Sequence, residues 1–278
     1  MLISARSFDE YRAMFALSDD DLALRILDCP GGAASFTAEA GERGADVVAV
    51  DPQYGPLRHQ LGKLAQREIE HKHQYVTDHA SGFVWDWFGD AERYTQLRTR
   101  SARAFATDIA ARPDRYVEGA LPRLPFPDRS FDLVLSSHLL FSYGAQLSEE
   151  FHLSALLELV RVARREVRLF PVVLHTSDRR YAALDRLRGA LDDRGVPSRL
   201  SRVDYEFQPG GNESLVLDCA DHCPLPTARP GADAHDPVRW RHLDAAGEPH
   251  LSAPRATPPG HEPPSSPAPG GHRGEASP

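Results

Sequence analysis

Residues 24–55 constrain the fold most strongly, because they have the pattern of a strand, a glycine turn, a helix and a second strand. Leu24–Asp28 is a short apolar run that ends in a carboxylate, which is typical of buried parallel strands. Gly31 and Gly32 follow, and a backbone without Cβ atoms can turn tightly and approach a ligand closely. Val47–Val50 is the second apolar run. The stretch therefore predicts the first half of an open α/β sheet.

Asp51 follows the second predicted strand directly. In open α/β sheets, ligands bind outside the carboxyl ends of the strands, and an acidic residue after the second strand can hold both hydroxyls of a ribose. Ser35 or Thr37 can cap the helix between the two strands, and Gly44 can end it. The pattern therefore predicts a nucleoside site at the glycine turn.

The glycine turn does not fit a dinucleotide-binding dehydrogenase, which needs G-x-G-x-x-G for the pyrophosphate. Residues 28–35 read DCPGGAAS, and this spacing resembles the D-x-G-x-G-x-G turn of class I S-adenosylmethionine-dependent methyltransferases. Asp28 stands at the leading acidic position and Gly32 at the middle glycine, whereas Ala34 replaces the third glycine. Pro30 replaces the first glycine, and a proline has no backbone N–H to offer a ligand.

A second motif strengthens this resemblance. Residues 124–134 read LPFPDRSFDLV and resemble the L-P-F-x-D-x-S-F-D-x-V segment around the third and fourth strands of these methyltransferases. Phe131–Leu135 is apolar and follows a turn of proline, aspartate and serine, so it is predicted to be a strand. Ser136, Ser137 and His138 then occupy its carboxyl end, over the expected ligand crevice.

The resemblance covers residues 20–220 and implies an α/β fold, a Rossmann-like, doubly wound, mostly parallel seven-stranded sheet with an antiparallel last strand. It implies S-adenosyl-L-methionine as the cofactor and methyl transfer as the reaction. The cofactor-binding residues that it implies are Asp28, Gly31, Gly32, Asp51, Ala120, Leu121 and Ser137. His138 is the candidate general base, because histidine titrates near neutral pH, and His175 and Tyr143 are weaker candidates.

Two departures from the family pattern leave the activity open. Pro30 removes one backbone donor, and Ala120 stands where many members carry an aspartate for the adenine amino group. Adenine recognition therefore falls to backbone groups near Ala120 and Leu121, and Asp28 is expected to orient the turn or the ammonium group of the cofactor. The alternatives are an active methyltransferase, an inactive methyltransferase-like binding or regulatory protein, and another nucleotide-dependent enzyme such as a dehydrogenase.

Charge and composition narrow the partners. The net charge of −8 argues against a broad nucleic-acid-binding surface, and the Arg-rich stretch 93–115 is interpreted as a solvated helix face. Residues 136–139 read SSHL instead of the N-P-P-Y signature of many enzymes that methylate amino groups of nucleic acid or protein, which favours a small-molecule acceptor. No apolar run suits a signal peptide or a membrane span, and the three cysteines do not suggest a disulfide framework. A cytoplasmic protein of open oligomeric state is therefore expected.

The chain is predicted to form a methyltransferase-like domain, 1–220, and a disordered tail, 221–278. From residue 222 onward lie 13 of the 23 prolines, and such a segment buries too little apolar surface to order itself. Residues 56–112 are predicted to be a helical insertion, whose aromatic cluster (residues 83–88 and Tyr94) forms either a small core or part of a substrate lid. The histidines at 71, 73 and 79 and the Cys/His group at 219–223 lack the ligand spacing of metal sites, so no metal is predicted.

Overall fold

The computed structural model describes residues 4–55, 58–175 and 177–222. The predicted disordered tail therefore lies outside the described residues from residue 223 onward. No helix within the described ranges is both long and apolar enough to cross a bilayer.

A single mixed sheet organises the described residues, with its strands in the order β3-β2-β1-β4-β5-β7-β6. The strands are β1 (Arg25–Asp28), β2 (Asp46–Asp51), β3 (Tyr116–Glu118), β4 (Phe131–Ser137), β5 (Ala163–Phe170), β6 (Ser198–Arg202) and β7 (Glu213–Asp218). Strands β1 to β5 pair in parallel, and β7 runs antiparallel to both β5 and β6. The predicted fold class is confirmed, including the antiparallel last strand.

The order of the strands reverses between β1 and β4, which are neighbours in the sheet. In a doubly wound sheet this switch point leaves a crevice at the carboxyl ends of the strands. Strands β2 and β4 are both longer than the apolar runs alone predict. They end at Asp51 and Ser137, so both polar residues belong to the strands that deliver them to the crevice.

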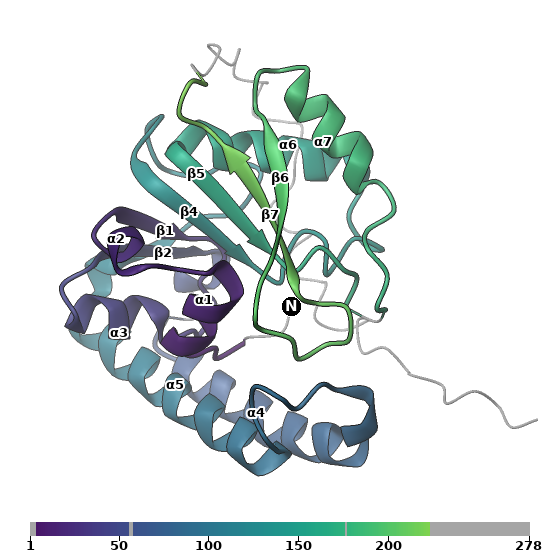
Figure 1. The fold of residues 1–278 in the computed structure, drawn as a ribbon. Coiled ribbons are helices and arrows are strands. Elements are labelled where there is room, and N and C mark those ends of the chain that lie inside the picture. The colour runs from purple at the N-terminus through teal and green to yellow at the C-terminus, as the bar shows by residue number, and fades with distance from the viewer. Residues whose placement is uncertain (1–3, 56–57, 176, 223–278) are drawn as a thin grey trace, which may run out of the picture. The chain divides into compact units, whose positions relative to one another are not determined.

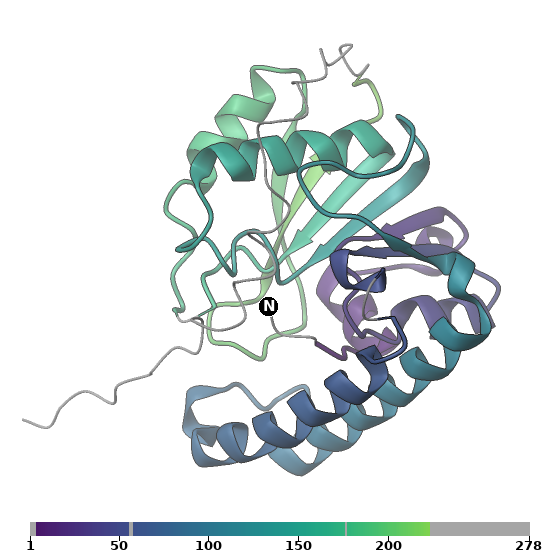
Figure 2. The same cartoon turned by 180° about the vertical axis from the view of Figure 1, so that it is seen from behind.

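Helices cover both faces of the sheet (Figures 1 and 2). The described helices are α1 (Phe8–Phe15), α2 (Asp19–Leu22), α3 (Phe36–Glu42), α4 (Leu61–Asp78), α5 (Ala91–Ala111), α6 (Glu149–Val162) and α7 (Leu184–Asp192), with 3-10 turns at Pro52–Tyr54, Ala80–Gly82 and Pro113–Arg115. The apolar faces of α6 and α7 pack with β1, β4 and β5 in one core, and α1 and α3 pack on the opposite face in a second core. Ser7 and Ser148 cap α1 and α6 through their side-chain oxygens.

The helical insertion forms a hairpin of α4 and α5, which pack closely along each other (Figure 1). Its inner residues build a third core with β2 and Tyr116 at the edge of the sheet. The aromatic cluster at its turn is a packed core that also includes the segment after β6. Phe207 stacks on Phe83 with ring centroids 4.7 Å apart and on Tyr94 at 4.9 Å. Of the two interpretations, the cluster is therefore a core, and it ties the insertion to the far half of the sheet.

Arg98 on α5 contradicts the interpretation of residues 93–115 as an entirely solvated face. Its side chain is only 5% exposed and pairs with Glu10, which is fully buried, at 2.7 Å. Glu10 also accepts a hydrogen bond from the hydroxyl of Tyr205 at 3.0 Å. This buried pair joins α1, α5 and the segment after β6, three parts of the chain that lie far apart in sequence.

Candidate functional site

A pocket opens at the carboxyl ends of β1, β2 and β4, where the strand order reverses. It is lined by Ser4, Arg6, Tyr11, Pro30, Gly31, Gly32, Asp51, Ser137, His138, Leu139 and Tyr143. Four of the residues predicted from the sequence as cofactor ligands, and the candidate base His138, are among them. The predicted site residues therefore meet around one hollow rather than being scattered over the sheet.

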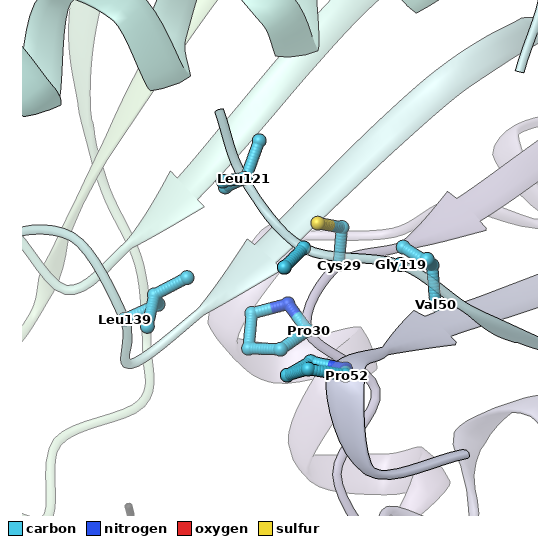
Figure 3. A pocket seen from close by; sticks show the side chains of 8 residues that line it. Cys29, Pro30, Val50, Pro52, Gly119, Leu121 and Leu139 are labelled. Atoms are coloured by element: carbon cyan, nitrogen blue, oxygen red, sulfur yellow. The ribbon is translucent and has the colours of Figure 1, made fainter. Parts of the chain in front are cut away.

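A second, apolar slot adjoins this pocket and shares Pro30 and Leu139 with it. Its lining is Cys29, Pro30, Val50, Pro52, Gly119, Ala120, Leu121 and Leu139, and the side chains of this lining gather around the slot in Figure 3. Ala120 and Leu121, predicted to flank an adenine, thus lie beside the glycine turn. An apolar slot of this kind suits a flat aromatic base, because such a base loses little by leaving water.

The glycine turn is packed so closely that a larger residue at Gly31 would clash with its neighbours. A Cβ atom on Gly31 would lie 2.5 Å from the hydroxyl oxygen of Tyr54 and 2.8 Å from the Cβ of Ala49. Gly32 has φ of +54°, a conformation that favours glycine. The Tyr54 hydroxyl donates a hydrogen bond to the Gly32 carbonyl at 2.8 Å. The turn is therefore pinned by a tyrosine that follows β2, and its backbone faces the pocket.

Asp51 is nearly inaccessible, and two backbone amides hold its carboxylate. Gly32 N–H donates to Oδ2 at 3.1 Å and Gln53 N–H to Oδ1 at 2.9 Å. Burial raises the pKa of Asp51 to about 6, although both amide hydrogen bonds act in the opposite direction. Each carboxylate oxygen keeps further lone-pair capacity, so the group can accept bonds from two adjacent hydroxyls.

Asp28 lies differently from what the sequence predicted. It is fully buried and lines neither pocket, and the hydroxyl of Tyr11 donates to both of its carboxylate oxygens at 3.0 and 3.2 Å. Burial raises the pKa of Asp28 well above its usual value. Asp28 therefore anchors Tyr11, which does line the pocket, whereas its own side chain lines neither hollow.

His138 and Ser137 occupy the carboxyl end of β4. The backbone of His138 has φ of +51°, unusual for a non-glycine residue, and its N–H donates to the Phe170 carbonyl at 2.6 Å. Its Nδ1 lies 2.9 Å from Ser137 Oγ. The pKa of His138 is well below its usual value, first because of burial and then because of nearby positive charges. The imidazole is therefore neutral at pH 7 and can accept a proton.

The positive charges near His138 belong to residues that were not predicted from the sequence to be part of the site. They are Arg6, Arg98 and Lys72, and Lys72 and Arg6 also lower the pKa of His175, on the segment after β5, after the larger effect of burial. Arg6 comes from the N-terminal segment and Lys72 from α4. No sequence motif marks either residue, and only Arg6 of the two lines the pocket.

Comparison with known proteins finds a family match over part of this chain. Residues 81–171, which include β3, β4 and β5, match the family model described as a methyltransferase domain. An uncharacterized protein of Methanocaldococcus jannaschii is 27% identical over 217 residues, which cover 78% of this chain and 95% of that protein.

Two solved structures are similar to this chain at lower sequence identity. One is magnesium protoporphyrin IX methyltransferase from Synechocystis PCC 6803, with a TM-score of 0.42, 15% identity and coverage of 76% of this chain and 77% of that one. The other is a SAM-dependent methyltransferase from Aquifex aeolicus, with a TM-score of 0.39, 13% identity and coverage of 76% and 93%. These structures add no argument about the site.

The family match and the sheet topology agree with the two sequence motifs. Residues 81–171 match a methyltransferase domain, and the sheet is the mostly parallel, seven-stranded one with an antiparallel last strand that the resemblance to class I S-adenosylmethionine-dependent methyltransferases implies.

Proposed function

We propose that the protein transfers a methyl group from S-adenosyl-L-methionine to a small molecule. One observation carries the proposal: the apolar slot at Ala120 and Leu121 joins the pocket that Asp51 and the glycine turn line. The base, the ribose and the amino-acid part of the cofactor need an apolar slot, a carboxylate and an open backbone, and these three environments lie side by side here. We name residues 28–32, 49–54 and 119–121 the nucleoside side of the site.

The residues of the nucleoside side fit this cofactor. The slot would take the adenine, Asp51 the ribose hydroxyls, and the backbone of Gly31 and Gly32 the amino-acid part, with Ser137 below it. The bound cofactor supplies an electrophilic methyl on a sulfonium. The protein contributes position and the exclusion of water, which account for much of the acceleration of such displacements.

His138 is proposed as the base that removes a proton from the acceptor. It lines the pocket beside Tyr143 and is neutral at pH 7 because its pKa is lowered. Its contact with Ser137 Oγ fixes the orientation of the ring. In the tautomer in which Nδ1–H donates to Ser137 Oγ, the opposite ring nitrogen, Nε2, carries the lone pair that can take the proton.

Pro30 and Ala120 favour a second candidate, a methyltransferase-like protein that does not methylate and acts by binding. Both positions lack a group that the family pattern offers to the cofactor, and both line the apolar slot. In this case the domain would recognise a partner through the same hollow.

Calorimetric titration of the full chain with S-adenosylmethionine and with S-adenosylhomocysteine separates the two candidates. We expect binding of both in the micromolar range and its loss in Asp51→Ala. Asp46→Ala is the matched control, because Asp46 begins the same strand and is exposed. A folded protein that binds neither ligand would overturn the proposed function and leave the second candidate. The domain limit proposed at residue 220 predicts that a chain ending at residue 222 binds as the full chain does.

A further inference from the structure

Residues outside the nucleoside side bring positive charge close to the pocket. We name Arg6, Lys72, His138, Tyr143 and His175 the acceptor side. Arg6 lines the pocket, and its charge and that of Lys72 both reach His138 and His175. Arg6 comes from the N-terminal segment and lines the pocket, whereas Lys72 comes from α4 and acts on the two histidines by its charge without lining the pocket.

Arg6 has hydrogen-bonding capacity that the protein does not use. Its Nη1 donates to Ser4 Oγ at 2.6 Å, and its Nε is buried without a hydrogen-bond partner in the described part of the chain. Among residues 4–55, 58–175 and 177–222, Arg6 forms no ion pair, whereas buried Arg98 is paired with Glu10. A buried guanidinium nitrogen without a partner costs free energy, and an anionic ligand would remove that cost.

Lys72 lies on the inner face of α4. It stands three residues after Ile69 and four before Val76, both of which are buried, so the three share one helix face. Its side chain is half-buried, and within the described ranges it forms no ion pair. Lys63 and Lys72 are the only lysines in the sequence, in which lysine and arginine together number 32. The ammonium group of Lys72 is thus an exception in a chain in which nearly all the cationic side chains are arginines.

The three buried carboxylates near the pocket do not neutralise these cations, although the charge of Glu68 acts on Lys72. Asp28 is bonded to Tyr11 with a raised pKa, which favours its neutral form, and Glu10 is taken up by Arg98 and Tyr205. Asp51 belongs to the ribose position. The cofactor itself brings a net positive charge, because it carries a sulfonium and an ammonium but only one carboxylate. Its binding would leave the acceptor side more positive than before.

We propose that the methyl acceptor carries a carboxylate or phosphate group and that Lys72 and Arg6 bind this group. The inference rests on the proposed function, because it assigns the substrate of that site. Such an anion would satisfy the free donors and offset the charges that lower the pKa of His138. The neighbouring base would thereby gain proton affinity only when the acceptor is bound.

Binding of simple anions to the full chain saturated with S-adenosylhomocysteine tests this assignment. The probes are inorganic phosphate, benzoate and the neutral benzamide, each titrated by calorimetry. We expect phosphate or benzoate to bind and benzamide not to bind, and the anion that binds identifies the group. Lys72→Met should weaken that binding roughly tenfold, the usual effect of losing a charged hydrogen bond, while Lys72→Arg retains most of it.

Lys63→Met is the matched control, since Lys63 is exposed on the same helix. We expect it to bind the anions as the wild type does, and all three variants to bind S-adenosylhomocysteine normally. Equal binding of benzoate and benzamide, no binding of either anion, or full anion binding by Lys72→Met would overturn the acceptor assignment alone. Failure of the wild type to bind S-adenosylhomocysteine would instead overturn the proposed function, and with it any acceptor role for the anion.

Discussion

The nucleoside side and the acceptor side lie next to each other at the same edge of the sheet but are built differently. The nucleoside side comes mainly from one continuous strand-turn-helix-strand unit, and its polar groups are bonded within the protein, as Asp51 is to Gly32 and Gln53. The acceptor side comes from four distant segments, and the Nε of Arg6 has no hydrogen-bond partner among the residues that the structure describes. The comparison teaches that the proposed cofactor site is built mainly from local structure, whereas the proposed acceptor site depends on long-range packing.

The largest expected effect concerns the buried pair that supports the acceptor side. Glu10→Ala leaves the Arg98 guanidinium buried without its partner, so we expect a loss of about 3–5 kcal/mol in the free energy of unfolding, measured by urea denaturation. Asp19→Ala breaks the exposed pair with Arg12 and should change stability by less than about 1 kcal/mol. Equal losses in the free energy of unfolding for the two substitutions would show that the buried pair contributes no more to stability than an exposed one.

Phe207→Ala tests whether the aromatic core positions the acceptor side. Loss of the stacked contacts with Phe83 and Tyr94 should cost about 2–3 kcal/mol, less than for a fully buried phenylalanine because this ring is half-buried. We expect weaker anion binding with unchanged affinity for S-adenosylhomocysteine. A parallel loss of both affinities would contradict the separation of the two sides.

Gly31→Ala tests the close packing of the nucleoside side. The added Cβ meets Tyr54 and Ala49, so we expect a loss of about 1–3 kcal/mol in stability and weaker binding of S-adenosylhomocysteine. Gly189→Ala in α7 is the control. Its Cβ meets nothing within 4 Å, and alanine favours a helix by about 1 kcal/mol, so this variant should be as stable as the wild type or more so. A Gly31→Ala protein of wild-type stability would mean that the turn is loosely packed.

The pH dependence of cofactor binding follows from Asp51. Its pKa is raised to about 6, so the carboxylate that accepts hydroxyl bonds is present above this pH and is lost as the pH falls through it. Affinity for S-adenosylhomocysteine should therefore be roughly tenfold lower at pH 5 than at pH 7. The Asp51→Asn variant should bind weakly with a flat profile. Constant wild-type affinity down to pH 5 would place the ribose elsewhere.

Tyr54→Phe has the smallest expected effect. It removes the hydrogen bond to the Gly32 carbonyl while keeping the ring packed on Phe105 and Tyr116. We expect a loss of about 0.5–1.5 kcal/mol in stability by urea denaturation and a small loss of cofactor affinity. A change in anion binding would show that the two sides communicate through the glycine turn.

The sequence by itself predicted most of the nucleoside side, because its strands, turn and helix form from residues that are close together along the chain. Apolar runs specify the parallel strands, glycine permits the turn, and Asp51 stands at the end of the second strand. The sheet class and the choice of Ala120 and Leu121 came instead from the resemblance of two short motifs to methyltransferases. The exception is Asp28, whose burial under Tyr11 depends on the packing of α1 and is not visible in the turn motif.

Only the tertiary structure decided the acceptor side. Arg6, Lys72 and His175 have no mutual spacing in the sequence, yet in the fold the charges of Arg6 and Lys72 lie close enough to lower the pKa of His175. The aromatic residues at 83–88 likewise became a core through Phe207, more than 100 residues later. Contacts between distant segments depend on how whole elements pack, and no local pattern of side chains encodes that packing.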